Sequence, residues 1–219
     1  GSFAQKLSMA EAKHAGDSII PEAILPFWQS LTLKEKAAQT LMVYMPSASY
    51  IKKHQFGGVL IMKSHLKDSL HLKEELSLAN ESLKIPLLTA IDQEGGQVNR
   101  LQAISPEWKN LPSAKEMRTM TDDSVYNLAK QIGNELHHYG INLNLAPVLD
   151  PPKDSKGKPS FIEVSNRSFG EFETAVPKIR SFVKGMKESK VLSTSKHFPG
   201  YDSWTNSDHQ IAFSTSSKE

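Results

Sequence analysis

The hydrophobic residues of this chain recur at two different periods, which alternate along the sequence. Stretches in which apolar residues repeat every three to four positions predict helices, and short continuous apolar runs predict buried strands. The helical pattern covers residues 32–45, 68–83, 123–138 and 171–188. Continuous apolar runs cover residues 59–62, 87–91, 141–149 and 191–195. Strands separated by helices are typical of a parallel β-sheet with helices packed against it.

Local signals support several of these boundaries. Thr32 followed by Glu35 has the spacing of a capping box, which begins a helix. Pro86 ends the second helix, because proline cannot continue a helical hydrogen-bond ladder. Pro177 lies within the fourth pattern, where we expect it to kink the helix or to mark its true start. The apolar face of that helix is predicted to contain Phe172, Val176, Ile179, Val183 and Met186.

Polar side chains capable of chemistry follow each of the four predicted strands. They are Lys63-Ser64-His65, Asp92-Gln93-Glu94, Asp150 and Lys196-His197. In a β/α barrel the active site is built at the carboxyl ends of the strands. A Rossmann-like sheet also binds ligands at that edge, but no Gly-x-Gly-x-x-Gly follows a strand here, which favours the barrel. The segments 102–122 and 151–169 contain several prolines, and we expect them to be long loops of the same domain, a type that is often functional.

Composition narrows the classes of function. The chain has 219 residues, 38% of them hydrophobic and 23% charged, which is typical of a globular domain. A net charge of +2 without a basic stripe predicts neither a nucleic-acid partner nor an anionic membrane partner. Apolar runs stay well below the ~20 residues that span a bilayer. The lack of cysteine excludes disulfides, thiolate catalysis and zinc–thiolate sites.

Three loop motifs carry groups that can bind and process a polar ligand. Asp92 can accept hydrogen bonds from sugar hydroxyls, and Arg167 can donate a pair of hydrogen bonds to a ligand oxygen. His209 follows a polar loop, and a histidine there can exchange protons near neutral pH. Taken singly, each has a simpler interpretation: a solvated turn residue, a structural ion pair and a surface histidine. A metal held by His197, His209 and Asp202 or Asp208 matches no known zinc spacing, so no metal is predicted.

Together, and in this order, the motifs resemble the catalytic barrel of glycoside hydrolase family three, in its branch of bacterial β-N-acetylhexosaminidases. The resemblance extends from about Leu31 to His209, so that residues 1–30 form an N-terminal extension and residues 31–219 a partial barrel. It predicts a (β/α)8 TIM-type barrel, with about five or six of the eight units in the chain. The motifs that carry it are Ile91-Asp92-Gln93-Glu94-Gly95-Gly96-Gln97-Val98, Ala146-Pro147-Val148-Leu149-Asp150, Asn166-Arg167-Ser168-Phe169-Gly170 and Lys196-His197-Phe198-Pro199-Gly200.

The resemblance also implies a reaction and a set of roles. Terminal β-linked N-acetylglucosamine would be removed from cell-wall fragments, as in peptidoglycan recycling, through a covalent glycosyl-enzyme on an aspartate. Asp92, Arg167, Lys196 and His197 would bind the sugar. His209 would be the general acid/base, with Asp208 beside it. The resemblance implies no metal or organic cofactor and a cytoplasmic enzyme, while an exported or periplasmic form stays open because a signal peptide could precede Gly1.

Several positions depart from the pattern of the branch. Ser207 stands where an aspartate usually orients the catalytic histidine, so Asp208 takes that part or the pair is weakened. Gln97 replaces an arginine, and Tyr201 replaces a histidine. The nucleophilic aspartate of the family lies on a later strand, beyond Glu219. We therefore expect the 219-residue chain alone to be nearly inactive.

Two further expectations and two alternatives complete the hypothesis. The loop 201–209 contains few apolar residues, and we expect it to be mobile without ligand. An incomplete barrel has an open sheet edge, which a homodimer or the missing segment would cover. The alternatives are a β-glucosidase of the same superfamily and a non-catalytic sugar-binding protein. Hydrolysis of two chromogenic sugars would separate the first alternative from the leading hypothesis.

Overall fold

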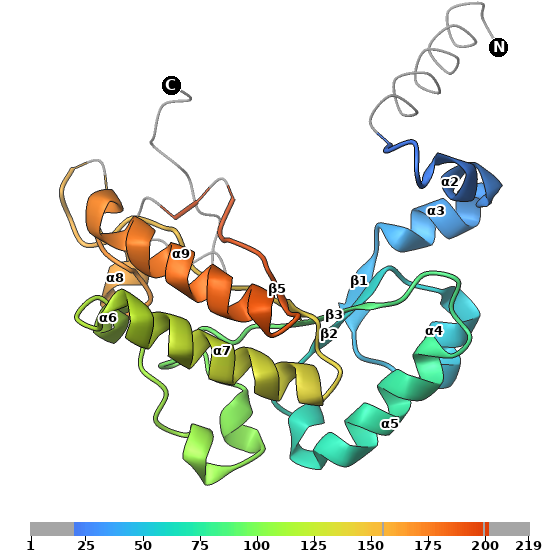
Figure 1. Ribbon diagram of the computed structural model, residues 1–219, viewed down its shortest axis with the longest axis horizontal. Coiled ribbons are helices and arrows are strands. Elements are labelled where there is room, and N and C mark those ends of the chain that lie inside the picture. Colours follow the sequence, from blue (N-terminus) through green and yellow to red (C-terminus); the bar gives the residue numbers. More distant parts are fainter. Residues whose placement is uncertain (1–19, 155, 199, 202–219) are drawn as a thin grey trace, which may run out of the picture.

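The computed structural model describes residues 20–154, 156–198, 200 and 201, which form one parallel α/β unit (Figure 1). Its five strands lie in the order β1-β2-β3-β4-β5, and every neighbouring pair is parallel. The strands are β1 (Met42–Tyr44), β2 (Gly58–Ile61), β3 (Leu88–Ile91), β4 (Leu143–Asn144) and β5 (Leu192–Ser193). This arrangement confirms the predicted α/β class with a parallel sheet.

Helices and short turns connect the strands. The α-helices are α2 (Leu25–Ser30), α3 (Leu33–Gln39), α4 (Ala48–His54), α5 (Ser69–Asn80), α6 (Ala114–Met117), α7 (Asp122–His138), α8 (Phe161–Val164) and α9 (Phe172–Glu188). The 3-10 turns are η1 (His65–Asp68), η2 (Leu101–Ala103) and η3 (Pro106–Trp108). The predicted helices after the first and second strands correspond to α5 and α7. The capping box at the start of α3 is also confirmed, because Glu35 and Thr32 exchange side chain-to-backbone hydrogen bonds.

The prediction of one helix over residues 32–45 was wrong in its second half. The helix α3 ends at Gln39, and Met42–Tyr44 forms the edge strand β1. A continuous apolar run fits a helical face and a strand equally well, so its pattern could not separate the two. The neighbouring strand decides the conformation: Met42 lies opposite Gly58, and the Met45 N–H donates to the Leu60 carbonyl oxygen at 3.1 Å.

The prediction for the buried face of α9 was also partly wrong. Phe172 is exposed, whereas Ala175, Phe182, Gly185 and Met186 are buried. The contact with α7 sets this face, because α7 and α9 lie side by side (Figure 1). A side chain on Gly185 would lie 2.5 Å from the Tyr126 carbonyl oxygen, so glycine permits the close approach. The helix passes through Pro177 without ending, so this proline does not mark its start.

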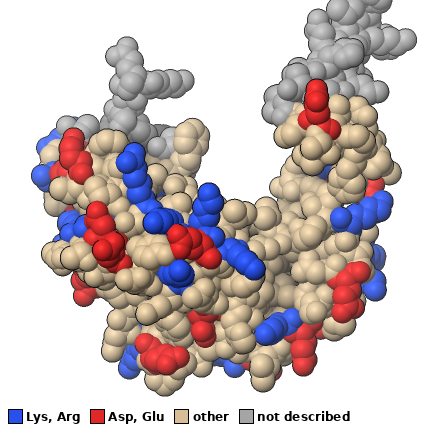
Figure 2. Space-filling view, viewed as in Figure 1, with Lys and Arg blue, Asp and Glu red and all other residues tan. Residues whose placement is uncertain are grey.

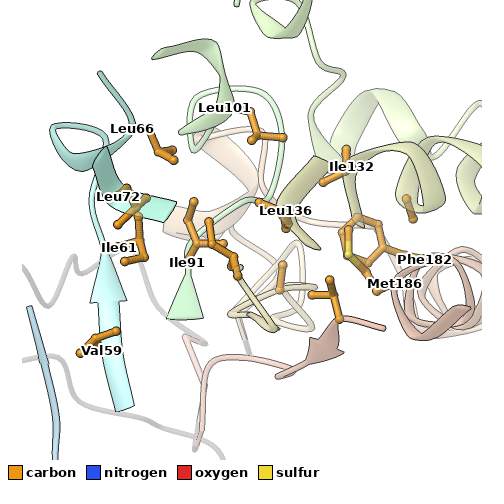
Figure 3. Packing of buried hydrophobic residues seen from close by; sticks show 14 of the residues in the cluster. Val59, Ile61, Leu66, Leu72, Ile91, Leu101, Ile132, Leu136, Phe182 and Met186 are labelled. Carbon is orange, nitrogen blue, oxygen red and sulfur yellow. The ribbon is translucent and has the colours of Figure 1, made fainter. Parts of the chain in front are cut away.

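The hydrophobic core lies between the sheet and the helices. Val59 and Ile61 of β2 and Ile91 of β3 are buried against residues of α5, α7 and α9, including Leu72, Leu136 and Phe182 (Figure 3). Side chains alternate between the two faces of a strand, so the intervening residues face away from the helices. Four apolar residues on that second face are exposed, Met42, Tyr44, Leu88 and Leu192, whereas Ala90 and Leu143 on the same face are buried.

Candidate functional site

A buried carboxylate, Glu94, lies at the centre of an ion-pair cluster beyond the carboxyl ends of the strands. Only 5% of its side chain is exposed. Its two oxygens accept hydrogen bonds from Arg167, from Nε at 2.8 Å and from Nη2 at 2.9 Å. Lys196 Nζ lies 2.7 Å from Glu94 Oε1 and 2.6 Å from Asp92 Oδ1. Side chains from three distant segments therefore meet in one cluster, which we call the Glu94 cluster.

Arg167 is charged in this cluster. Burial lowers the pKa of its guanidinium, but Glu94, Asp150 and Asp92 outweigh that effect and raise the pKa above its ordinary value. One edge of the guanidinium pairs with Glu94 in the two-bond geometry that suits a carboxylate. This pairing uses Nε and Nη2 and does not involve the other N–H groups of the guanidinium.

A second pair, His197 and Asp150, adjoins the Glu94 cluster through the peptide that joins Lys196 to His197. Asp150 Oδ2 lies 2.6 Å from His197 Nδ1 and accepts the His197 backbone N–H at 3.1 Å. Its other carboxyl oxygen accepts the backbone N–H of Tyr201 at 2.6 Å. Because a carboxylate only accepts hydrogen bonds, the His197 proton lies on Nδ1, which directs Nε2 away from Asp150. The Asp150 side chain is 1% exposed, so it acts here as a fixed orienting group.

Amide side chains and glycines hold the loop that carries Asp92 and Glu94. Gln93 is buried, and its Oε1 accepts the backbone N–H groups of Arg100 and Leu101 at 2.7 and 3.0 Å. Its own N–H donates to Asn144 Oδ1 of β4 at 3.0 Å. Gly95 has a φ of 97°, a conformation that favours glycine. Asp92 and Glu94 are therefore held by a loop that the hydrogen bonds from Arg100 and Leu101 to Gln93 close.

The structure brings four of the predicted site residues to one edge of the sheet. Asp92, Lys196 and Arg167 belong to the Glu94 cluster, and His197 lies beside it on Asp150. The other two, Asp208 and His209, lie outside the described residues. The loop 201–209 is likewise outside them except for Tyr201, whose ring meets the His197 ring edge to face at 4.7 Å.

Two residues were missed as members of the site. Glu94 and Asp150 were noted only as parts of motifs, although each is the acceptor that organises its neighbours. Their positions in the motifs were the available signal. Nothing in the sequence distinguishes an acidic residue that pairs with cations from one that faces solvent.

In the described part of the chain, residues 20–154, 156–198, 200 and 201, no group of three or more His, Asp or Glu side chains is placed to hold a metal ion. No helix in that part is long and apolar enough to cross a membrane.

A parallel sheet with a polar cluster beyond the carboxyl ends of its strands is the arrangement found at the active-site rim of a β/α barrel. The chain belongs to glycosyl hydrolase family 3. The family described as "Glycosyl hydrolase family 3 N terminal domain" matches residues 32–219. The predicted resemblance is thereby confirmed.

Similar proteins support the same branch of the family, that of the β-N-acetylhexosaminidases. A Beta-hexosaminidase of Actinobacillus pleuropneumoniae is 31% identical over 151 residues, which are 66% of this chain and 41% of the relative. A solved family 3 beta-N-acetylglucosaminidase from Paenibacillus is 30% identical and superposes with a TM-score of 0.66, over 81% of this chain and 35% of that one. The Beta-N-acetylhexosaminidase from Beutenbergia cavernae is 26% identical with a TM-score of 0.64, over 78% and 55%. The chain therefore spans about a third to just over half of the length of these relatives.

Proposed function

We propose that this chain is part of the catalytic barrel of a retaining β-N-acetylhexosaminidase, which removes terminal β-linked N-acetylglucosamine from bacterial cell-wall glycans. The single observation that carries the proposal is the Glu94 cluster at the carboxyl rim of the sheet. It combines cationic donors with partly open acceptors: 25% of the Asp92 side chain and 29% of the His197 side chain are exposed. The relatives named as β-hexosaminidases supply the substrate class.

Each proposed sugar contact follows from the groups that the protein leaves open. Asp92 uses Oδ1 for Lys196, so Oδ2 can accept a sugar hydroxyl. Lys196 and Arg167 have N–H groups beyond those bonded to Glu94, and these can donate to sugar oxygens. His197 offers Nε2, because Asp150 holds Nδ1.

The nucleophile is proposed to come from outside the described residues. A retaining mechanism needs a carboxylate that attacks the anomeric carbon, while an acid protonates the oxygen of the leaving group. Within the cluster, Glu94 is enclosed by Lys196 and Arg167, Asp150 is bound to His197 and Tyr201, and Asp92 is paired with Lys196. All three carboxylates are thus engaged in holding the site. His209, beside Asp208, is the proposed acid/base.

The experiment compares the 219-residue chain with the complete gene product. An aryl β-N-acetylglucosaminide and the matching aryl β-glucoside are the two substrates. We expect the complete gene product to prefer the first substrate and the 219-residue chain to turn over little of either. Retaining turnover by the short chain would contradict the proposal for the nucleophile. Preference for the glucoside would favour a β-glucosidase, and sugar binding without hydrolysis by the complete product would favour a binding protein.

A matched pair of lysine variants tests the site itself. Lys196 and Lys178 each have a side chain that is 15% exposed and an ion pair of 2.6 Å with an aspartate. Lys196 belongs to the Glu94 cluster, whereas Lys178 of α9 pairs with Asp122 of α7. We expect Lys196→Met to weaken binding of N-acetylglucosamine at least about tenfold, the value of one charge-assisted hydrogen bond, and Lys178→Met to leave it unchanged. Equal effects of the two variants would refute the proposed site.

A further inference from the structure

The segment 111–118, which contains α6, lies between the two loops that meet in the Glu94 cluster. On one side it contacts the loop that carries Glu94. The Gly96 N–H donates to the Leu111 carbonyl oxygen at 3.0 Å. A side chain on Gly96 would lie 2.7 Å from the Cβ of Ser113, so the two backbones are in close contact. The position of Glu94 is therefore tied to this segment.

On its other side the segment holds the loop that carries Arg167. The Lys115 N–H donates to the Asn166 carbonyl oxygen at 3.3 Å. Arg118 Nε donates to the Ser168 carbonyl oxygen at 3.0 Å. The residues directly before and after Arg167 are thus both bonded to the same short segment. Ser168 also donates its hydroxyl to the Asp150 carbonyl oxygen at 3.2 Å, which links this loop to the His197 pair.

The Arg118 side chain is itself anchored to α8. Its guanidinium forms a two-bond ion pair with Glu163, and Lys115 Nζ lies 3.2 Å from the same carboxylate. Burial raises the pKa of Glu163, but the hydrogen bonds and charges of Arg118 and Lys115 outweigh it and lower the pKa below its ordinary value. The carboxylate is therefore ionised near neutral pH. An arginine held at one edge by a carboxylate keeps its Nε in a fixed direction.

We propose that Arg118 is a positioning residue for Arg167. By holding the Ser168 carbonyl, it sets the register between the Arg167 loop and the Glu94 loop. The guanidinium of Arg167 then meets Glu94 and presents its remaining N–H groups to the ligand. Among the described residues, the polar partners of Arg118 are Ser168 and Glu163, so its proposed effect on Arg167 passes through the loop. The ligand in this proposal rests on the proposed function, whereas the link from Arg118 to Arg167 does not.

The first measurement needs no sugar. In the full chain, the Nε–H of Arg167 is followed by ¹⁵N-resolved hydrogen exchange, because its bond to Glu94 protects that proton. We expect Arg118→Met to speed this exchange about tenfold or more, which corresponds to the loss of a charge-assisted hydrogen bond. Lys130→Met is the control: it removes an ion pair between α7 and Glu188 without touching either loop.

The second measurement is the binding of N-acetylglucosamine, and the KM and kcat of the complete gene product. A misplacement of about 1 Å in a binding group can cost up to about a hundredfold. We therefore expect Arg118→Met to raise the dissociation constant and KM about tenfold or more, with a smaller change in kcat. Arg118→Lys should recover part of the lost sugar affinity, because a lysine keeps the charge but loses the two-bond geometry. A purely structural role would lower stability without this split between KM and kcat.

The two proposals fail in different ways. Unchanged exchange at Arg167 in folded Arg118→Met overturns the positioning role, whether or not the sugar binds. If Arg118→Met does not fold, Glu163→Gln gives the same test from the other end of the ion pair. A third outcome is also possible: Arg118→Met speeds exchange at Arg167, while the unsubstituted complete gene product neither binds N-acetylglucosamine nor hydrolyses its glycosides. That outcome supports the positioning role and overturns the proposed function.

Discussion

At the scale of the residue, Glu94 lies between two cations in a part of the molecule from which water is largely excluded. An isolated buried carboxylate is costly, but here Lys196 and Arg167 surround it at hydrogen-bonding distance. The same contacts that make its burial tolerable occupy both of its oxygens. Glu94 therefore organises the site and leaves Asp92 as the more open acid of the cluster.

Replacing Glu94 with glutamine should destabilise the protein strongly. The amide keeps the size of the side chain but removes the negative charge that pairs with Arg167. The same charge also pairs with Lys196, which Asp92 pairs with as well. Breaking a buried ion pair from one side costs about 3–5 kcal/mol, so we expect Glu94→Gln to lower the free energy of unfolding by roughly that amount, less whatever Asp92 compensates. Glu188→Gln, which breaks an exposed pair with Lys130, is the control and should change little. Urea denaturation of both variants tests this prediction. Equal midpoints would show that the Glu94 charge does not make the expected contribution to the free energy of unfolding.

At the scale of the element, the packing of α7 against α9 depends on small residues at the crossing. Gly133 of α7 and Gly185 of α9 each have a neighbour where a side chain would begin: Ser189 Cβ at 2.7 Å and the Tyr126 carbonyl oxygen at 2.5 Å. These two helices flank β4 in the sequence and precede β5. Their separation therefore influences where Asp150 and Lys196 lie.

The substitution Gly185→Ala tests this close approach. Alanine favours a helix over glycine by about 1 kcal/mol, so without the neighbouring helix the change would be stabilising. The new methyl group would meet a backbone oxygen that cannot rotate away, and such overpacking costs about 1–3 kcal/mol. We expect a net loss of stability in thermal unfolding. Arg180→Ala, at an exposed position on the same helix, should be neutral or slightly stabilising, and a gain at Gly185 as well would disprove the tight crossing.

At the scale of the whole molecule, the face of the sheet that points away from the helices is apolar; it is buried at Ala90 and Leu143 and exposed toward β1 and β5. Tyr44, Leu60, Ala90, Leu143 and Leu192 occupy one register across the five strands. Tyr44 at one end of this row is 67% exposed, and Leu192 at the other is 59% exposed. Figure 2 shows the molecule hollowed between α3 and α9, with mostly uncharged residues on the side toward α3 and charged side chains toward α9. In a closed barrel, layers of such side chains fill the interior.

This face predicts the behaviour of the 219-residue chain in solution. Exposed apolar surface binds hydrophobic dyes and promotes association. We expect the chain to bind such a dye and to associate as its concentration rises in sedimentation velocity. Leu192→Lys should reduce both effects. The control is Leu70→Lys, since Leu70 is 71% exposed on α5, away from this row. If the two variants behave alike, the inner face is not the cause of association.

The sequence by itself was sufficient for the class of fold, because the two periods of its apolar residues are local properties. Each predicted strand overlaps one of β2, β3, β4 and β5, and α5, α7 and α9 follow the predicted helices closely. It was also sufficient to bring Asp92, Arg167, Lys196 and His197 forward as candidates. Parallel strands end at a common edge, so residues that follow successive strands lie near one another whatever the details of packing.

The tertiary structure decided what depends on neighbours far away in the chain. Met42–Tyr44 is a strand because β2 lies beside it, and Phe172 is exposed because α9 meets α7 through Gly185. The same reason explains the roles of Glu94 and Asp150. A carboxylate becomes an organising group only when cations or N–H groups from distant segments enclose it. Burial and partner geometry are properties of the folded chain, and no local pattern of residues contains them.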